Sequence, residues 1–295
     1  MSQSPNTFIV GAAKTGTTSL FEYLVQHPDV SLPEIKESHY FSLGLIGRDF
    51  GGPGDRESVS HVPQSLAEYE ALFDGCDNPI RIDGSTSYFP CEKSAAAIKE
   101  YCPDGKILIG LRNPARRSFS AYSHLRRAQR ETELDFRDGL ELEAERTAEN
   151  FIYMWRYRAV SRYYEHVKRF YDTFDRDQIY LFIFERFIKD PKTELANVCS
   201  FLGIDDQFAF DTDQKHNQSA VMDDGAFSKA VYSGNPVVKV LKKLIPSGIK
   251  QKLVKSRTYK LELDQEIYES LNQEFASEID QVEALVGQDM SLLRG

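Results

Sequence analysis

The fold is decided by the stretch FIVGAAKTGTTSL at residues 8–20. Its first residues form an apolar run that predicts a short buried strand, Gly11 and Gly16 bound a loop, and the residues after Gly16 predict the start of a helix. Such a loop directs backbone N–H groups and the positive end of the helix dipole at one spot, which suits a phosphate. Further hydroxyl donors come from Thr17, Thr18 and Ser19.

This loop differs from the usual ATP- or GTP-binding loop. That motif, G-x-x-x-x-G-K-[ST], requires a lysine directly after the second glycine. Here Thr17 takes that position, and the loop's lysine, Lys14, lies between the two glycines. The sequence therefore predicts a phosphate-binding loop whose positive charge sits elsewhere than in ATP- and GTP-binding proteins.

Short apolar runs and helical patterns alternate along the chain. The predicted strands are residues 7–11, 80–83, 106–111 and 178–184. The predicted helices are residues 16–26, 65–73, 92–101, 115–127, 136–149, 158–174, 192–202 and 263–286. Because the strand runs show no polar alternation, both faces of each strand are expected to be buried. The pattern predicts an α/β protein with a central parallel sheet flanked by helices and a helical C-terminal extension.

Composition is ordinary for a globular protein, with 41% hydrophobic and 27% charged residues among 295. We expect a single domain over residues 1–295, with an α/β core at 1–220 and a helical part at 221–295. The net charge of −9 disfavours a nucleic-acid partner. The sequence shows no signal peptide, no transmembrane run and no paired or zinc-like cysteine spacing, so we expect a cytoplasmic protein with reduced thiols and no metal site.

Two further segments stand out by composition. Residues 43–63 are rich in glycine and contain proline, which favours a loop on the substrate side over a passive insertion. Residues 226–260 carry many lysines and no acidic residue. This basic segment is either a solvated face, which we prefer, or a surface for an anionic acceptor, a cofactor or, through residues 237–260, a membrane.

A second candidate phosphate site follows the predicted strand 106–111. Arg112 ends the strand, Pro114 suits the first turn of the next helix, and Ser120 lies about two turns into that helix. An arginine and a hydroxyl so placed can hold one phosphate from two sides. Together with the first loop, this predicts a nucleotide phosphorylated at both ends of its ribose.

The two phosphate motifs together carry a family resemblance. G-x-x-K-[TS]-G-T-[TS] at residues 11–18 and R-[ND]-P-x-x-x-x-x-S at residues 112–120 resemble the sulfotransferases that use 3′-phosphoadenosine 5′-phosphosulfate (PAPS). The branch that they resemble is that of bacterial enzymes similar to heparan sulfate sulfotransferase domains. Residues 36–41 resemble the family's K-E-x-H-F-F, and residues 83–88 resemble its E-K-[ST]-P-x-Y.

The resemblance implies a P-loop-like sulfotransferase fold, PAPS as co-substrate and no metal. It implies that the 5′-phosphosulfate is held by Lys14, Thr15, Gly16, Thr17, Thr18 and Ser19, and that Arg112 and Ser120 hold the 3′-phosphate. Lys14 would neutralise the leaving oxygen, Glu37 would act as the base, and His39 would orient Glu37 or the acceptor. The acceptor would offer a hydroxyl or an amine on a carbohydrate, a lipid or a small natural product.

The chain departs from the family pattern at three positions. Gly84 replaces the lysine and Thr86 the proline of E-K-[ST]-P-x-Y, so a charge contact is missing or supplied elsewhere. Ser42 replaces an aspartate that often follows H-F-F, which argues against a heparan-like acceptor. Two rival interpretations remain: a metal-dependent P-loop kinase or NTPase with Asp83 as metal ligand, and a non-catalytic nucleotide- or glycan-binding module. We predict a sulfotransferase.

Overall fold

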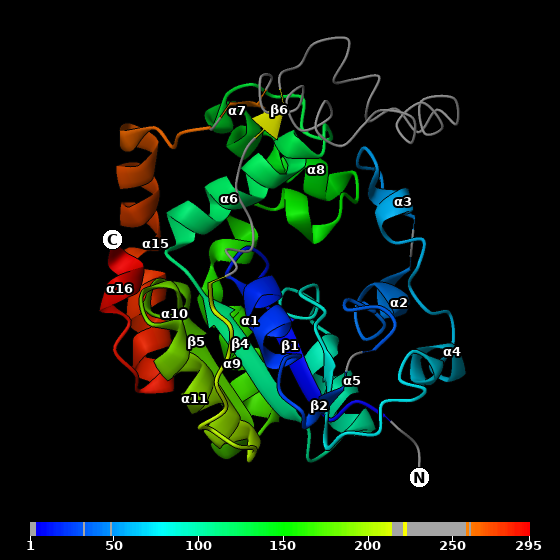
Figure 1. Cartoon of the computed structure of the whole chain (residues 1–295). Coiled ribbons are helices and arrows are strands. Elements are labelled where there is room, and N and C mark those ends of the chain that lie inside the picture. The colour runs from blue at the N-terminus through cyan, green and yellow to red at the C-terminus, as the bar shows by residue number, and fades with distance from the viewer. Residues whose placement is uncertain (1–3, 32, 48, 214–220, 223–257, 260) are drawn as a thin grey trace.

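A five-stranded parallel sheet forms the centre of the molecule (Figure 1). The computed structural model describes residues 4–31, 33–47, 49–213, 221–222, 258–259 and 261–295. In the order β2-β3-β1-β4-β5 the strands are β2 (Val30–Ser31), β3 (Ile80–Asp83), β1 (Thr7–Gly11), β4 (Lys106–Leu111) and β5 (Ile179–Ile183). The predicted α/β class and all four predicted strands are confirmed. β2 was not predicted, because two residues are too few to show a pattern.

Helices cover both faces of this sheet (Figure 1). One face packs against α5 (Ser94–Tyr101), α9 (Tyr163–Thr173), α15 (Gln265–Val286) and α16 (Ser291–Arg294). The other face packs against α1 (Thr17–Leu24), α10 (Phe184–Lys189) and α11 (Pro191–Leu202). Neighbouring strand residues such as Phe8 and Ile9 therefore enter different cores, and this explains why the strands read as continuous apolar runs.

A third core lies outside the two sheet faces. Around it the chain forms α2 (Leu43–Ile46), α3 (Asp55–Ser58), α6 (Pro114–Arg127), α7 (Phe136–Glu141), α8 (Glu143–Ala148) and the first half of α15. A further α-helix, α4 (Leu66–Ala71), begins after the N-cap Ser65, whose hydroxyl accepts from the Glu68 N–H. The loop predicted at 43–63 thus holds two one-turn helices, α2 and α3.

Two predicted helices are wrong in extent. The helix predicted at 136–149 breaks at Leu142, where ψ is −4°, and Glu143 then accepts hydrogen bonds from the N–H groups of Arg158 and Ala159. Those bonds hold the segment before Tyr163 in a 3₁₀ turn, Ala159–Ser161, so the helix predicted at 158–174 begins only at Tyr163. Tertiary hydrogen bonds override helix propensity in both places.

The C-terminal part is not wholly helical as predicted. β6 (Val221–Met222) and β7 (Thr258–Tyr259) pair as an antiparallel ladder before α15 begins. The basic segment 226–260, with its predicted roles, lies almost entirely outside the described residues. Within the part of the chain that is described, every helix is too short or too polar to cross a membrane. The four cysteines, all of them described, form no disulfide.

Candidate active site

The phosphate loop joins β1 to α1 and depends on a glycine at its end. Gly16 is the N-cap of α1 with φ at 86°, and a Cβ on it would stand 2.8 Å from the Phe184 ring. Both the positive φ and this close approach require glycine. Lys14 also has a positive φ, 74°, so the loop turns sharply twice within three residues.

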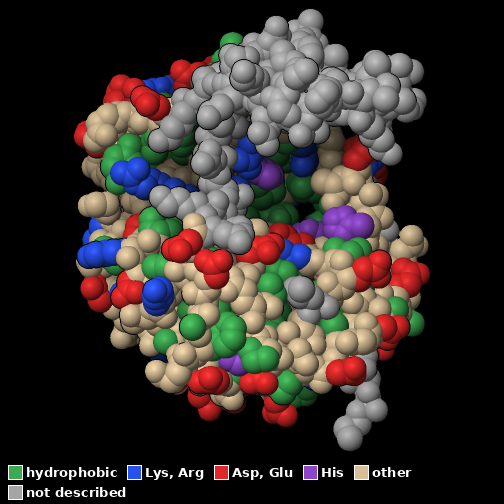
Figure 2. Space-filling model, viewed as in Figure 1, with side chains coloured by type: hydrophobic (Ala, Val, Ile, Leu, Met, Phe, Trp, Pro, Cys, Tyr) green, Lys and Arg blue, Asp and Glu red, His purple; other side chains and the backbone are tan. Residues whose placement is uncertain are grey.

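The loop forms one wall of a cavity of about 370 Å³. Figure 2 shows it as a hollow in which Lys, Arg and His side chains are visible. Of the predicted site residues, those that line the cavity are Lys14, Gly16, Thr17, Thr18, Ser19, Glu37, His39, Arg112 and Ser120. Thr15 is the exception: it is fully buried, and its hydroxyl donates to the Ala12 carbonyl at 2.7 Å.

Arg112 follows β4 directly, as predicted, and lies against the phosphate loop. Its Nη1 donates to the Lys14 carbonyl at 3.3 Å, and its guanidinium stacks over the Phe184 ring at 4.5 Å. The Arg112 Nε is buried without a hydrogen-bond partner. A buried unpaired donor is costly, so this group fits an anion that enters the cavity and accepts its hydrogen bond.

Sequence reasoning missed three cavity residues on α6. Ser123, His124 and Arg127 follow Ser120 by three, four and seven positions, so all four share one face of the helix. The same spacing was visible in the sequence once Ser120 had been identified. The Ser123 hydroxyl is a further buried group without a partner, and Arg127 Nη2 lies 3.1 Å from His124 Nδ1.

Positive charge is concentrated where the phosphate loop, Arg112 and α6 line the cavity. Burial, together with the nearby guanidiniums of Arg127, Arg117 and Arg112, lowers the pKa of Lys14 to about 8. Burial also lowers the pKa of His124 to about 3, so this imidazole is neutral near pH 7. Cations held this close together without acids between them are suited to a ligand with several negative charges.

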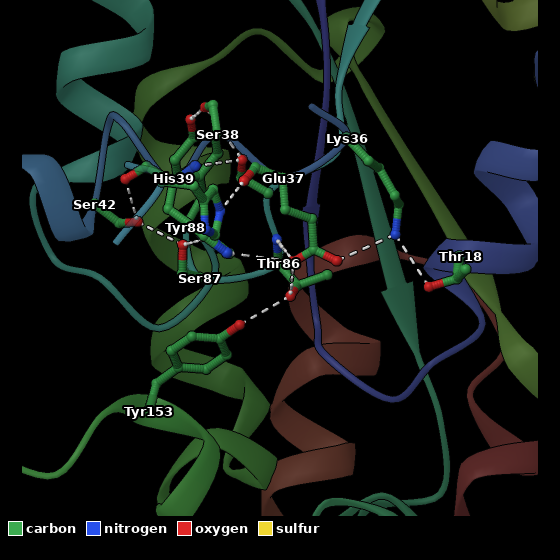
Figure 3. Close-up of polar contacts among 12 residues, drawn as sticks. Thr18, Lys36, Glu37, Ser38, His39, Ser42, Thr86, Ser87, Tyr88 and Tyr153 are labelled. Atoms are coloured by element: carbon green, nitrogen blue, oxygen red, sulfur yellow. Dashed lines mark hydrogen bonds and ion pairs between the residues drawn. The ribbon is translucent and has the colours of Figure 1, made fainter. Parts of the chain in front are cut away.

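Glu37 is the one carboxylate among the cavity-lining residues that the structure describes. Figure 3 shows its partners: Lys36 Nζ donates to Oε1 at 3.2 Å, and Thr86 Oγ1 donates to Oε2 at 3.0 Å. Burial alone would raise the pKa of Glu37, but Lys36, His39 and these hydrogen bonds hold it below its usual value. The carboxylate is therefore ionised near neutral pH, as a proton acceptor must be.

Two further contacts fix the position of Glu37. Because Thr86 gives its only hydroxyl hydrogen to Glu37, the Tyr153 hydroxyl, 3.1 Å away, donates to Thr86 Oγ1. Lys36 Nζ also donates to Thr18 Oγ1 at 3.0 Å, which joins Glu37 to the phosphate loop (Figure 3). Sequence reasoning missed Tyr153, since nothing in its local pattern marks it.

His39 stands beside Glu37 but is held by other residues. Its Nδ1 lies 2.7 Å from Ser87 Oγ, and its Nε2 lies 3.8 Å from Glu37 Oε2, too far for a hydrogen bond. Burial lowers the pKa of His39 to about 4, so the ring is neutral near pH 7. Its φ of 56° places it in the left-handed region, which turns the side chain toward the cavity.

Asp83, the metal ligand of the rival kinase interpretation, has no free oxygen. Its carboxylate accepts hydroxyl hydrogen bonds from Ser38, Tyr69, Tyr88 and Ser85 and is buried. Among the residues with described positions, no cluster of three or more His, Cys, Asp or Glu side chains has the arrangement of a metal site. The geometry gives Asp83 a structural role under the site.

A parallel sheet with a phosphate loop after β1, and a cavity that gathers cations around one carboxylate, is typical of nucleotide-dependent group transfer. A family model described as "Sulfotransferase domain" matches residues 4–283. The chain therefore belongs to the sulfotransferase domain family.

Individual relatives agree with this assignment. A sulfotransferase crystal structure from Alicyclobacillus acidocaldarius superposes with a TM-score of 0.80 at 35% identity and covers 99% of both chains. Human heparan sulfate glucosamine 3-O-sulfotransferase 3B1 is 28% identical over 203 residues, which are 68% of this chain and 47% of that protein. Human heparan sulfate glucosamine 3-O-sulfotransferase 6 is 29% identical over 205 residues, 68% of this chain and 52% of that protein. The chain spans about half the length of these curated relatives.

Proposed function

We propose that this protein transfers the sulfuryl group of PAPS to a hydroxyl or an amine of an acceptor. The observation that carries the proposal is the cavity itself, where one ionised carboxylate, Glu37, faces a cluster of lysine and arginine side chains on the phosphate loop, β4 and α6. Membership in the sulfotransferase family supports it. The unpaired Nε of Arg112 fits the several anionic groups of PAPS.

In the proposed reaction the acceptor oxygen or nitrogen attacks sulfur in line with the bond to the leaving phosphate oxygen. The new bond to sulfur forms as the sulfur–oxygen bond breaks, and adenosine 3′,5′-bisphosphate leaves with that electron pair. Glu37 takes the acceptor's proton, and Lys14 neutralises the charge that develops on the leaving oxygen. Such transfers depend mainly on positioning and on stabilising developing charge.

The remaining residues bind and orient. The loop residues Lys14, Thr15, Gly16, Thr17, Thr18 and Ser19 hold the 5′-phosphosulfate, with Thr15 contributing its backbone because its side chain faces Ala12. Arg112 and Ser120 hold the 3′-phosphate. His39, neutral and fixed by Ser87, orients the acceptor rather than Glu37, since 3.8 Å separates its Nε2 from the carboxylate.

A binding comparison tests the donor. Calorimetric titration with adenosine 3′,5′-bisphosphate, and separately with ATP and magnesium, is run in EDTA-treated and metal-supplemented buffer. We expect the bisphosphate to bind with or without metal. Metal-dependent binding of ATP alone would contradict the proposal and favour a kinase-like activity.

The Glu37→Gln variant tests the mechanism. It keeps the size of the side chain and removes its basicity, so the bisphosphate should bind with nearly unchanged affinity while transfer falls by about 10²–10⁴-fold. If the substitution instead abolishes nucleotide binding, Glu37 is not the base.

A further inference from the structure

Part of the cavity lining is apolar. Four of its residues, Leu43, Val59, Ile152 and Met154, belong to one buried hydrophobic cluster. We refer to these four residues as the apolar wall. It comes from two separate segments, the one that holds α2 and α3 and the one before α9, so it is a feature of the fold rather than of one loop.

Positive charge on this side is already neutralised. Arg130 is the one Lys or Arg that lines it within the described ranges, and its guanidinium pairs with the buried carboxylate of Asp55. Arg130 Nε also donates to the Pro53 carbonyl at 2.6 Å, and the guanidinium lies over the Trp155 ring. An arginine held in this way has little capacity left to bind a sulfate or a carboxylate of a substrate.

The other groups on this side do not favour an anion either. His39 is neutral near pH 7 because burial lowers its pKa, and Glu37 is negative and would repel an acidic acceptor. Tyr153 presents a hydroxyl that is committed to Thr86. The other lysine and arginine side chains among the described residues of the cavity lining, Lys14, Arg112 and Arg127, come from the phosphate loop, the end of β4 and α6.

We propose that the acceptor is an uncharged alcohol or phenol with an apolar body, which packs against the apolar wall and presents its hydroxyl to Glu37. This rests on the proposed sulfuryl transfer from PAPS and separates the chain from relatives named for heparan sulfate. A polyanionic sugar chain would place negative groups against Leu43, Val59, Ile152 and Met154, where the one cation among the described lining residues, Arg130, is already paired with Asp55. An apolar body loses nothing there and is removed from water.

The test compares acceptors with the full chain and PAPS. Values of kcat/KM are measured for 1-octanol, for 2-naphthol and for a sulfated heparan oligosaccharide, and binding of adenosine 3′,5′-bisphosphate is measured on the same preparation. We expect kcat/KM for octanol or naphthol to exceed that for the oligosaccharide by at least about 100-fold. Comparison of octanol with naphthol shows whether the site prefers an aliphatic or an aromatic body. If the protein binds the bisphosphate but prefers the oligosaccharide, or transfers sulfate to neither class of acceptor, the acceptor proposal is overturned. Absence of bisphosphate binding overturns the proposed function instead.

Substitution in the apolar wall provides the second arm. Met154→Glu should lower kcat/KM for the apolar acceptor at least about tenfold with unchanged bisphosphate affinity, whereas Met154→Leu, which keeps the surface apolar, should lower it much less. Met154→Ala, which adds no charge, should raise the KM for the apolar acceptor several-fold. This variant provides the test if Met154→Glu does not fold. The matched control is Leu134→Glu, at a side chain that is 70% exposed and outside the cavity. Equal activity of wild type, Met154→Glu and Met154→Ala would overturn the proposal.

Discussion

The side chain of Lys36 lies across Gly84. A Cβ at position 84 would stand 3.3 Å from Lys36 Cε and 3.4 Å from Lys36 Cγ, and the Gly84 N–H donates to the Lys36 carbonyl at 3.0 Å. Gly84 replaces the lysine of the family's E-K-[ST]-P-x-Y motif, and the structure places the ammonium of Lys36 on Glu37 and Thr18 in that region. Lys36, the lysine of the K-E-x-H-F-F pattern, therefore brings a positive charge to Glu37 in the region where Gly84 brings none.

This arrangement predicts how Lys36 affects the pKa of Glu37, the proposed base. Lys36 lowers the pKa of Glu37, so Lys36→Met should raise that pKa and more of Glu37 will be protonated at a given acidic pH. The acidic limb of kcat/KM should therefore move to higher pH, by about one unit, while Lys36→Arg largely restores it. Lys189→Met, at an exposed lysine, is the control. An acidic limb at the same pH in wild type and Lys36→Met would contradict the role.

The pKa of Lys14 predicts how kcat/KM falls on the basic side of its pH profile. Its pKa of about 8 means that the free enzyme loses this charge just above neutral pH, and in the proposed reaction the leaving oxygen is then no longer neutralised. We expect kcat/KM for PAPS to fall above about pH 8, because this parameter reports the free enzyme. Lys14→Arg should move the fall to higher pH, and Lys14→Ala should reduce turnover by about 10²–10³-fold. An unshifted profile in Lys14→Arg would assign the basic limb to another group.

Local patterns predicted the parts of the site that follow strands directly. The Gly11–Gly16 spacing and Arg112 after β4 could be read from sequence, because parallel strands present their carboxyl ends at one edge of the sheet. Thr15 was included by motif position, although its side chain faces the core. Leu43 and Val59 of the apolar wall come from residues 43–63, the segment predicted as a substrate-side loop. Arg130 and residues 152–154 could not be foreseen, because tertiary packing alone brings them to the cavity.

Arg112 should distinguish nucleotides by their 3′-phosphate. If its unpaired Nε binds that group, Arg112→Ala should lower the affinity for adenosine 3′,5′-bisphosphate by roughly 10–100-fold, because a charge-assisted hydrogen bond is lost. The affinity for adenosine 5′-phosphate should fall much less. Calorimetric titration with the two ligands measures the difference. Arg116→Ala, at an exposed arginine of α6, is the control for losing one positive charge near the site. An equal loss for both nucleotides would remove Arg112 from the 3′-phosphate site.

Asp55 joins the two segments that carry the apolar wall. Its buried carboxylate pairs with Arg130 and accepts from the Ile152 N–H and Trp155 Nε1, both at 3.0 Å. Asp55→Ala leaves Arg130 without its counter-charge and should lower the free energy of unfolding by about 3–5 kcal/mol, measured by urea denaturation.

The Asp49–Arg56 pair supplies the matched control for Asp55. Both side chains are largely exposed, so Asp49→Ala should cost less than about 1 kcal/mol. Replacing Arg130 as well, in Asp55→Ala with Arg130→Met, should recover part of the loss, since no unpaired charge is left buried. Since the proposed role of the apolar wall is to position the acceptor and not the nucleotide, folded Asp55→Ala should also show a raised acceptor KM with unchanged bisphosphate affinity. Equal costs for Asp55→Ala and Asp49→Ala would show that the buried pair does not hold the wall.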